Sequence, residues 1–239
     1  MTTEAPLGGR SALVTGASRG IGRQVALRLA DAGAHVWCLA RTEPAVRSLA
    51  ADLGGEPLVA DLTDDVATWD ALDRMSERLG GAPDVVVNAA GVFGLASSHT
   101  ESVKAFDESV AVNLRGPFLV NRALLPAMLD RGSGLIVNVG SVAGRRALRG
   151  NAAYSASKYG LRGYHEVLLE ELRGRGVRAT LLEPAATDTT AWDPIEPEHA
   201  ADVPMRAEML RADDVAEAVL FVATRPDTVR IPLLQIEHA

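Results

Sequence analysis

The chain has 239 residues, of which 47% are hydrophobic and 23% charged, and its formal net charge is −7. This size and composition predict one soluble globular domain, and the lack of any Lys- or Arg-rich block argues against a nucleic-acid or membrane partner. No apolar run is long enough to span a bilayer, the N-terminus has no signal-peptide pattern, and the single cysteine excludes an intrachain disulfide, which together favour a cytoplasmic protein.

Short apolar runs alternate with longer amphipathic segments from one end of the chain to the other. The first half is expected to form a strand over 11–15, a helix over 20–32, a strand over 35–40, a helix over 44–53, a strand over 57–60, a helix from 64 or 65 to 79 and a strand over 83–88. The second half is expected to form two helices within 103–130, a strand over 135–139, a helix from about 151 to 173, a strand over 177–182, a helix from 213 and a last strand over 231–236. This alternation predicts a single α/β domain over 1–239, with an open parallel sheet of about seven strands covered by helices on both faces.

A glycine-rich turn follows the first expected strand, in Thr15-Gly16-Ala17-Ser18-Arg19-Gly20-Ile21-Gly22. Glycines permit a tight turn and a close approach of the backbone, and the N–H groups that begin the next helix favour a pyrophosphate. The spacing differs from that of the general dinucleotide fingerprint. The place of the turn, between the first strand and the first helix, nevertheless predicts a dinucleotide site.

A tyrosine and a lysine stand four residues apart in a predicted helix, at Tyr154 and Lys158. Four residues are about one helical turn, so both side chains lie on one face. A cation about 4 Å from a phenol is worth about 4 kcal/mol at an effective dielectric of about 20, or about three pKa units. We therefore expect Lys158 to lower the pKa of Tyr154 and prepare it as an acid or base, with Ser141 near the same oxygen. The same spacing also occurs in ordinary pairs on solvated helices.

Several motifs, in order and correctly spaced, resemble those of the short-chain dehydrogenase/reductase family, whose fold is a Rossmann-type doubly wound sheet. The glycine turn matches the family's Thr-Gly-x-x-x-Gly-x-Gly, and Asn88-Ala89-Ala90-Gly91 matches its Asn-Asn-Ala-Gly. The family's helix-borne Asn and its active-site Ser, Tyr and Lys are matched by Asn113, Ser141, Tyr154 and Lys158. The resemblance extends from about Gly9 to Ile236 and implies an oxidoreductase that interconverts a carbonyl and an alcohol.

The resemblance also implies a role for each matching residue. Tyr154 would exchange a proton with the substrate oxygen, Ser141 would orient that oxygen, Lys158 would also hold the nicotinamide ribose, and Asn113 would tie Lys158 to a chain of water molecules. The residues implied in cofactor binding are Gly16, Ser18, Arg19, Gly20, Ile21, Gly22, Arg41, Asp61, Leu62, Asn88, Ala89, Gly91, Tyr154, Lys158, Pro184, Thr187 and Thr189. The five histidines show no ligand spacing, so no metal site is expected.

The choice between NADP and NAD depends on the end of the second strand, Leu39-Ala40-Arg41-Thr42. An acid there would bind the ribose 2′-OH and repel a 2′-phosphate, and this chain has none. Arg41 and Arg19 could each give the phosphate a charge-assisted hydrogen bond worth about 1.5–3 kcal/mol, or could be solvated loop residues. Because the competing acid is absent, we favour NADP(H) over NAD(H).

The chain departs from the family pattern in two places. Ala89 replaces the second Asn of Asn-Asn-Ala-Gly, and a small residue still fits there. Ala185 replaces the Gly of the family's Pro-Gly-x-Val-x-Thr and removes a permissive backbone position. We expect the contacts of Thr187 and Thr189 to survive and the geometry of this loop to differ.

Substrate identity is expected to depend on residues 92–99, 142–151 and 185–209. The second segment contains three arginines that could attract an anionic substrate or carrier, or be solvated loop charges, which is the interpretation we favour: Arg145, Arg146 and Arg149. The third segment contains three prolines and is expected to be an irregular lid over the substrate. The apolar residues of this lid are Trp192, Ile195, Met205 and Met209.

The predicted function is thus an NADP(H)-dependent reductase or dehydrogenase for a small carbonyl or alcohol substrate. An alternative within the same class is a 3-oxoacyl-carrier-protein reductase, for which the three arginines would bind the carrier. A different class is a nicotinamide-nucleotide sensor without chemistry, which Ala89 and Ala185 would fit but the retained Tyr154 and Lys158 would not. By resemblance, the helices within 103–130 and 152–173 would pair subunits into a homo-oligomer, a dimer or a homotetramer.

Overall fold

A computed structural model describes residues 5–198 and 203–239 of the chain. Its main sheet has seven parallel strands in the order β3-β2-β1-β4-β5-β6-β9. The bounds are β1 (Ser11–Thr15), β2 (His35–Ala40), β3 (Glu56–Val59), β4 (Val85–Asn88), β5 (Gly134–Val139), β6 (Val177–Pro184) and β9 (Leu233–Ile236). The predicted doubly wound sheet is confirmed, and the β1–β4 pair is the point at which the strand order reverses.

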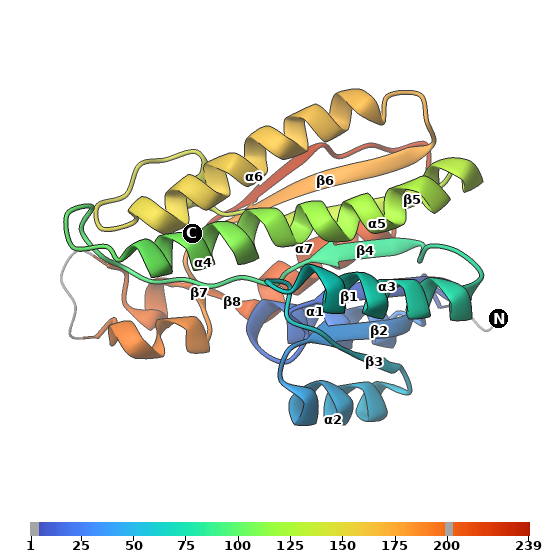
Figure 1. Ribbon diagram of the computed structural model, residues 1–239, viewed down its shortest axis with the longest axis horizontal. Helices are drawn as coiled ribbons and strands as arrows, with labels where there is room; N and C mark the ends of the chain where they lie inside the picture. Colours follow the sequence, from blue (N-terminus) through green and yellow to red (C-terminus); the bar gives the residue numbers. More distant parts are fainter. Residues whose placement is uncertain (1–4, 199–202) are drawn as a thin grey trace.

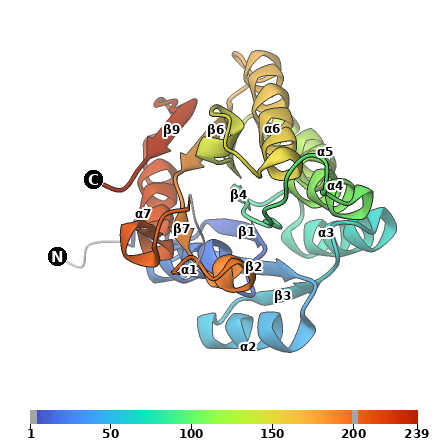
Figure 2. The ribbon, with the colours of Figure 1, turned by 90° about the vertical axis from the view of Figure 1, so that its left-hand side faces the viewer.

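Within the described residues, seven α-helices cover the two faces of this sheet (Figure 2). They are α1 (Gly20–Asp31), α2 (Glu43–Leu53), α3 (Asp65–Leu79), α4 (Val103–Val110), α5 (Gly116–Arg131), α6 (Ala152–Glu171) and α7 (Ala212–Ala223). None of the helices in the described ranges is long and apolar enough to cross a membrane. Asp64 caps α3 by accepting a hydrogen bond from the backbone N–H of Ala67 at 3.0 Å.

The two faces of the sheet bury separate hydrophobic cores. Leu13 faces the core shared with α3, α5 and α6, where it joins Leu124 and Met128, whereas the next residue, Val14, faces the core shared with α1, α2 and α7, where it joins Leu29. All five side chains are fully buried. Successive strand residues point to opposite faces, so an uninterrupted apolar run is what a strand covered on both sides requires.

The two helices expected within 103–130 are joined end to end (Figure 1). Between α4 and α5 the chain does not leave the helical path but passes through a π-helical turn, Ala111–Arg115. Pro117 stands in the first turn of α5 and has no backbone N–H to donate to the preceding helical turn. The π turn contains Asn113, and single π turns are frequent at functional sites.

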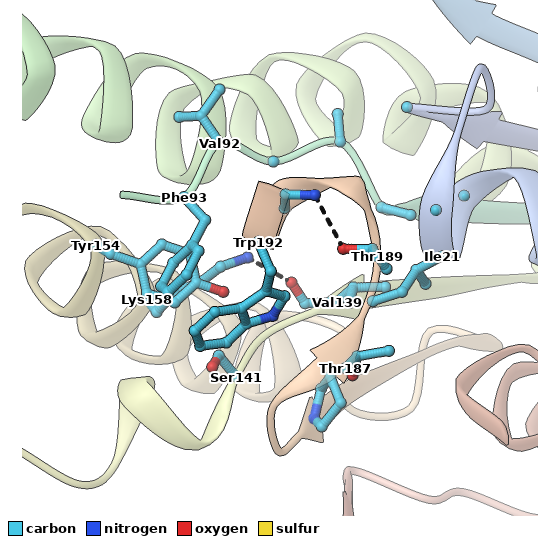
Figure 3. Close-up of a pocket in the computed structure, with 18 of the residues that line it drawn as sticks. Ile21, Val92, Phe93, Val139, Ser141, Tyr154, Lys158, Thr187, Thr189 and Trp192 are labelled. Atoms are coloured by element: carbon cyan, nitrogen blue, oxygen red, sulfur yellow. Dashed lines mark hydrogen bonds between the residues drawn. The ribbon is translucent and has the colours of Figure 1, made fainter. Parts of the chain in front are cut away.

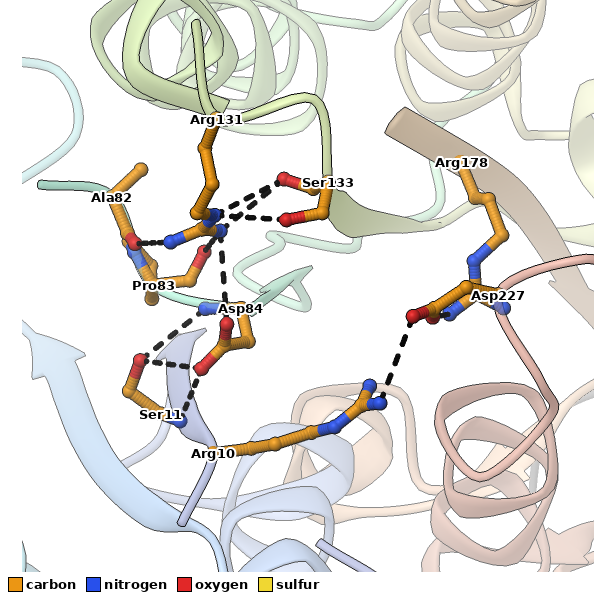
Figure 4. Close-up of polar contacts among 9 residues, drawn as sticks. All are labelled: Arg10, Ser11, Ala82, Pro83, Asp84, Arg131, Ser133, Arg178 and Asp227. Atoms are coloured by element: carbon orange, nitrogen blue, oxygen red, sulfur yellow. Dashed lines mark hydrogen bonds and ion pairs between the residues drawn. The ribbon is translucent and has the colours of Figure 1, made fainter. Parts of the chain in front are cut away.

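Polar contacts tie together the amino-terminal ends of the strands (Figure 4). Asp84, just before β4, accepts a hydrogen bond from the backbone N–H of Ser11 at 2.8 Å. Arg131 donates to the carbonyls of Ala82 and Pro83 at 2.7 and 3.1 Å. These contacts stabilise the sheet at the amino-terminal ends of its strands. The cavity described below lies at the opposite, carboxyl ends of the strands.

The described parts of the lid segment 185–209 contain only short elements. Its base is a second, two-stranded sheet of β7 (Thr187–Asp188) and β8 (Leu210–Arg211), and 3-10 turns occupy Thr190–Ile195 and Arg206–Glu208. Residues 199–202 of the predicted lid lie outside the described residues. Ala185 has no positive φ, and its N–H donates to the carbonyl of Ile236 at 2.9 Å, so this loop forms without the conformational freedom of a glycine.

Candidate active site

A cavity of about 820 Å³ opens at the carboxyl ends of the strands. Its walls come from the segments that follow β1 to β5 and from the end of β6, together with α6 and the lid. The volume lies in the upper part of the range usual for small-molecule sites, about 300–1,000 Å³. Ligands of open α/β sheets bind at this edge, next to the strand pair where the order reverses.

All but two of the residues predicted from the sequence line this cavity. Those that line it are Gly16, Ser18, Arg19, Gly20, Ile21, Gly22, Arg41, Asp61, Leu62, Ala89, Gly91, Ser141, Tyr154, Lys158, Pro184, Thr187 and Thr189. Figure 3 shows Tyr154 and Lys158 at one end of the cavity and Ile21 at the other. Segments that are up to about 170 residues apart in sequence thus form one site, because parallel strands end at a common edge.

Asn88 and Asn113 are the two exceptions, and both are buried behind the cavity wall. The Asn88 side chain is 2% exposed and donates hydrogen bonds to the Oδ1 atoms of Asn121 and Asn138, each at 2.8 Å. Asn138 in turn contacts the ring Nδ1 of His165 at 3.2 Å. The Asn88 side chain therefore fixes the end of β4 from inside the protein and does not face the cofactor groove as the sequence analysis implied.

The glycine turn forms a bare backbone cradle. A Cβ atom on Gly16, whose φ is 68°, would lie 2.6 Å from the Cα of Ala90, and one on Gly22 would lie 2.4 Å from the carbonyl oxygen of Gly16. Thr15 holds the facing segment, since its hydroxyl accepts hydrogen bonds from the N–H groups of Ala89 and Ala90 at 3.1 Å. The N-terminus of α1 lies within this turn, so the cradle fits a pyrophosphate group.

Two arginines flank the groove beside this cradle in different electrostatic surroundings. The Nη1 atom of Arg41 lies 3.7 Å from Oδ2 of Asp61, so a carboxylate already compensates part of its charge. Burial raises the pKa of Asp61, but hydrogen bonds from Thr63 and the charge of Arg41 outweigh burial, and the pKa lies below its ordinary value. Arg19 is exposed and makes no ion pair with any residue in 5–198 or 203–239.

Tyr154 and Lys158 lie one turn apart on α6, as predicted. Lys158 is 5% exposed, and its Nζ donates to the carbonyl oxygen of Val139 at 2.8 Å. Burial lowers the pKa of Lys158 to about 8. The ammonium lies 5.6 Å from the centre of the Tyr154 ring.

The expected lowering of the Tyr154 pKa by Lys158 is not found. Burial raises the pKa of Tyr154 above its ordinary value, and a hydrogen bond with Ser141 opposes that rise. Lys158 does not lower the pKa of Tyr154 in this arrangement, in which its Nζ donates to the Val139 carbonyl. Ser141 is the residue that stabilises the phenolate in this arrangement, from its position at the start of the 3-10 turn Val142–Gly144.

Asn113 holds the loop that follows β4. Its Oδ1 accepts from the N–H of Val92 at 2.9 Å, and its Nδ2 donates to the Val92 carbonyl and to the Ser157 hydroxyl, both at 3.0 Å. Ser157 in turn donates to the carbonyl oxygen of Tyr154 at 2.7 Å. Asn113 therefore links the loop after β4 to the turn of α6 that carries Tyr154, and Ser157 is a member of the site that sequence reasoning missed.

Three aromatic rings from separate segments meet beside the reactive end of the cavity. Phe93 contacts Tyr154 edge to face with ring centres 4.9 Å apart, and it contacts Trp192 of the lid at 4.7 Å. Trp192 is 9% exposed, so the described part of the lid packs against the site. The sequence pointed to Trp192 through the composition of the lid, whereas Phe93 had no signal beyond its place in segment 92–99.

The three arginines of segment 145–149 do not behave alike. Arg145 is 27% exposed and forms ion pairs with Glu183, at 3.4 Å, and with Glu237. The interpretation of Arg145 as a solvated loop charge is therefore wrong, because a buried carboxylate on β6 draws it inward. Arg146 and Arg149 are exposed and line the cavity. No group of three or more His, Cys, Asp or Glu residues suited to a metal occurs in the part of the chain that the structure describes.

Comparison with known proteins gives consistent findings. A family model described as short chain dehydrogenase matches residues 10–200. The D-threitol dehydrogenase of Mycolicibacterium smegmatis is 35% identical over 227 residues, which cover 91% of this chain and 87% of the relative. An NADP-dependent 3-hydroxy acid dehydrogenase of Salmonella typhi is 33% identical over 232 residues, covering 94% and 93%. A metagenomic short-chain oxidoreductase solved in complex with NADP has a TM-score of 0.81 at 33% identity, covering 98% of this chain and 99% of that chain.

Proposed function

Since the chain belongs to the short-chain dehydrogenase family and is an oxidoreductase of that family, we propose that it interconverts a carbonyl group and an alcohol with NADP(H), using Tyr154 as the residue that exchanges the proton. One observation carries this proposal. Ser141, Tyr154 and Lys158 stand at one end of the cavity that has the glycine cradle at its other end. A proton-transfer group and a dinucleotide groove in one cavity are what this reaction requires.

The chain's own residues divide the work as follows. The nicotinamide cofactor, when bound, supplies or accepts the hydride, and the glycine cradle, Thr187 and Thr189 would hold it. Ser141 hydrogen-bonds the substrate oxygen beside the Tyr154 hydroxyl, and Tyr154 gives that oxygen a proton in reduction and takes it back in oxidation. Lys158 supplies a buried positive charge beside the phenol. Phe93 and Trp192 exclude water from this end of the cavity.

The preference for NADP(H) is supported by the two arginines of the groove and by the relatives that use NADP. Arg19 should contribute more than Arg41, because Asp61 already compensates part of the Arg41 charge. We therefore expect Arg19→Ala to reduce the preference for NADPH over NADH more than Arg41→Ala does. Arg23→Ala, an exposed arginine on α1, is the matched control.

The test of the chemistry measures NADPH oxidation against a panel of aldehydes, ketones and 3-oxo acids. Tyr154→Phe should lower kcat about 10²- to 10⁴-fold, the usual contribution of a positioned acid, while NADPH binding is kept. Tyr159→Phe is the control, because Tyr159 lies on the same helix and is 45% exposed. Equal turnover by Tyr154→Phe and Tyr159→Phe would refute the role of Tyr154. Tight NADPH binding without turnover of any carbonyl would favour the nucleotide sensor.

We also propose that the chain works as a homo-oligomer, a dimer or a homotetramer. Exposed apolar side chains on helices that lie side by side support this, since Phe106 on α4, Phe118 on α5 and Val167 on α6 are 40%, 43% and 56% exposed. Light scattering coupled to size-exclusion chromatography measures the mass directly, and a monomer at micromolar concentration would refute the proposal.

A further inference from the structure

The loop between the 3-10 turn Val142–Gly144 and α6 lies over the reactive end of the cavity. The loop follows Ser141 and ends three residues before Tyr154, so both of its ends are at the site. Its position is held by the N–H of Ala96, which donates to the carbonyl of Gly150 at 2.9 Å, and by a bridge between Ala96 and Asn151. Side chains on this loop therefore have a defined place over the substrate end of the cavity.

The arginines of this loop are divided between two environments. Arg145 is turned toward Glu183 and Glu237, and its charge is compensated there. Arg146 and Arg149 line the cavity and are exposed. The side chain of neither makes an ion pair or a hydrogen bond with any residue among 5–198 and 203–239. Exposed arginines whose only role is solubility are not expected to line the cavity that contains the reactive tyrosine.

The charge balance of the cavity is positive at this end. Of the acids that line it among residues 5–198 and 203–239, Asp61 is paired with Arg41 and Glu237 with Arg145. Glu208 is the remaining acid of this described lining, and it caps the 3-10 turn of the lid by accepting from the N–H of Met205 at 2.9 Å. Within the described lining, Arg146, Arg149 and Lys158 together outnumber that carboxylate. Two guanidinium groups that have no partner in the described part of the chain attract an oxyanion, since each can form two parallel hydrogen bonds to it.

We propose that Arg146 and Arg149 form a specificity-determining subsite for an oxyanion, a carboxylate or a phosphate ester, carried by the carbonyl substrate at a distance from its reacting carbon. This inference rests on the proposed function, because it assigns the far end of the same substrate. The curated relatives leave the question open, because D-threitol is a neutral polyol and a 3-hydroxy acid is an anion. Because Arg146 and Arg149 are positively charged, the subsite favours anionic substrates over neutral ones of the same shape.

The test compares matched pairs of substrates that differ in charge. One pair is acetoacetate and methyl acetoacetate, and the other is glyceraldehyde 3-phosphate and glyceraldehyde, so that the two pairs distinguish a carboxylate from a phosphate. The expected result is that kcat/KM for at least one anion exceeds that for its neutral partner by about 10- to 100-fold, the worth of one charge-assisted contact. The excess should fall as ionic strength rises, because the subsite is exposed.

The variant for this test is the double substitution Arg146→Gln and Arg149→Gln. It should abolish the preference for the anion by raising KM for the charged substrate, with kcat/KM for the neutral partner unchanged within about twofold. Arg175→Gln is the control, since it removes the same charge from an exposed position after α6 that does not line the cavity. A wild-type enzyme that prefers neither anion, or a double variant that slows charged and neutral substrates equally, would overturn the inference.

Binding measurements separate this inference from the proposed function. If no carbonyl is turned over, the proposed function fails, and calorimetry of acetoacetate and of glyceraldehyde 3-phosphate with the NADP⁺-loaded protein still tests the subsite. Binding of either anion that is lost in the double variant but kept in Arg175→Gln would support the subsite. Absence of binding to the wild-type protein, or equal binding to the double variant, would overturn it.

Discussion

Replacing Lys158 by Met should make the protein more stable. Burial lowers the pKa of Lys158 from 10.5 to about 8, and one pKa unit corresponds to 1.36 kcal/mol, so the charged form is destabilised in the folded state by about 3 kcal/mol. Loss of the charge-assisted hydrogen bond to the Val139 carbonyl would cost about 1.5–3 kcal/mol. The net expectation at neutral pH is a gain of up to about 2 kcal/mol in the free energy of unfolding, or up to about 8 °C in Tm for a chain of this length.

The pH dependence gives an independent test of the same reasoning. A lysine whose folded pKa is depressed destabilises the fold below that pKa, where both states carry the proton. As pH rises from about 8 toward 10.5, the folded state releases its proton before the unfolded state does, so the stability of the wild-type protein should increase over this window. The Lys158→Met variant lacks the group and should not show this increase.

The assay is denaturant unfolding of the wild-type protein, Lys158→Met and Lys104→Met at several pH values from about 7 to 10. Lys104 is exposed on α4, and its substitution should change stability by less than about 0.5 kcal/mol. The stabilised Lys158→Met variant should also lose catalytic activity, since function requires the charge that the fold disfavours. A lower stability of Lys158→Met at neutral pH, or a wild-type stability that stays flat above pH 8, would show that the buried ammonium costs nothing.

Two further predictions follow from burial and from backbone clearance. Burial lowers the pKa of His165 from 6.5 to about 4, so between these pH values the unfolded state binds a proton that the folded state does not. The free energy of unfolding should therefore fall by about 2–3 kcal/mol as pH drops from 6.5 toward 4.5. Denaturant unfolding of His165→Gln should show a smaller fall. An acid sensitivity that is identical in the two proteins would assign the effect to other groups. Gly22→Ala should destabilise the protein by about 1–3 kcal/mol and weaken NADPH binding, because its Cβ would lie 2.4 Å from the Gly16 carbonyl oxygen. Gly163 on α6 has open space where a Cβ would lie, so Gly163→Ala should be neutral or slightly stabilising. Equal NADPH affinity in Gly22→Ala and Gly163→Ala, measured by fluorescence titration, would contradict the role given to the glycine cradle.

The sequence by itself was sufficient to predict the order of strands and helices, the doubly wound sheet and most of the cavity lining. These features depend on hydrophobicity and on the positions of glycines, which can be read from the sequence. Apolar runs such as Val85–Asn88 predict strands covered on both sides, and the glycines of the turn after β1 indicate backbone that must approach other backbone closely. The spacing of Tyr154 and Lys158 follows from the pitch of a helix alone.

Only the tertiary structure decided what each of these side chains contacts. Asn88 is turned inward because Asn121 and Asn138, from other elements, offer it acceptors, and Lys158 is held by a carbonyl at the end of β5. The arginines of one short loop have different environments because the buried carboxylate of Glu183, 38 residues further along the chain, forms an ion pair with Arg145 and not with Arg146 or Arg149. Burial, pairing and pKa depend on which distant segments pack together, and that information is not present in the spacing of residues along the sequence.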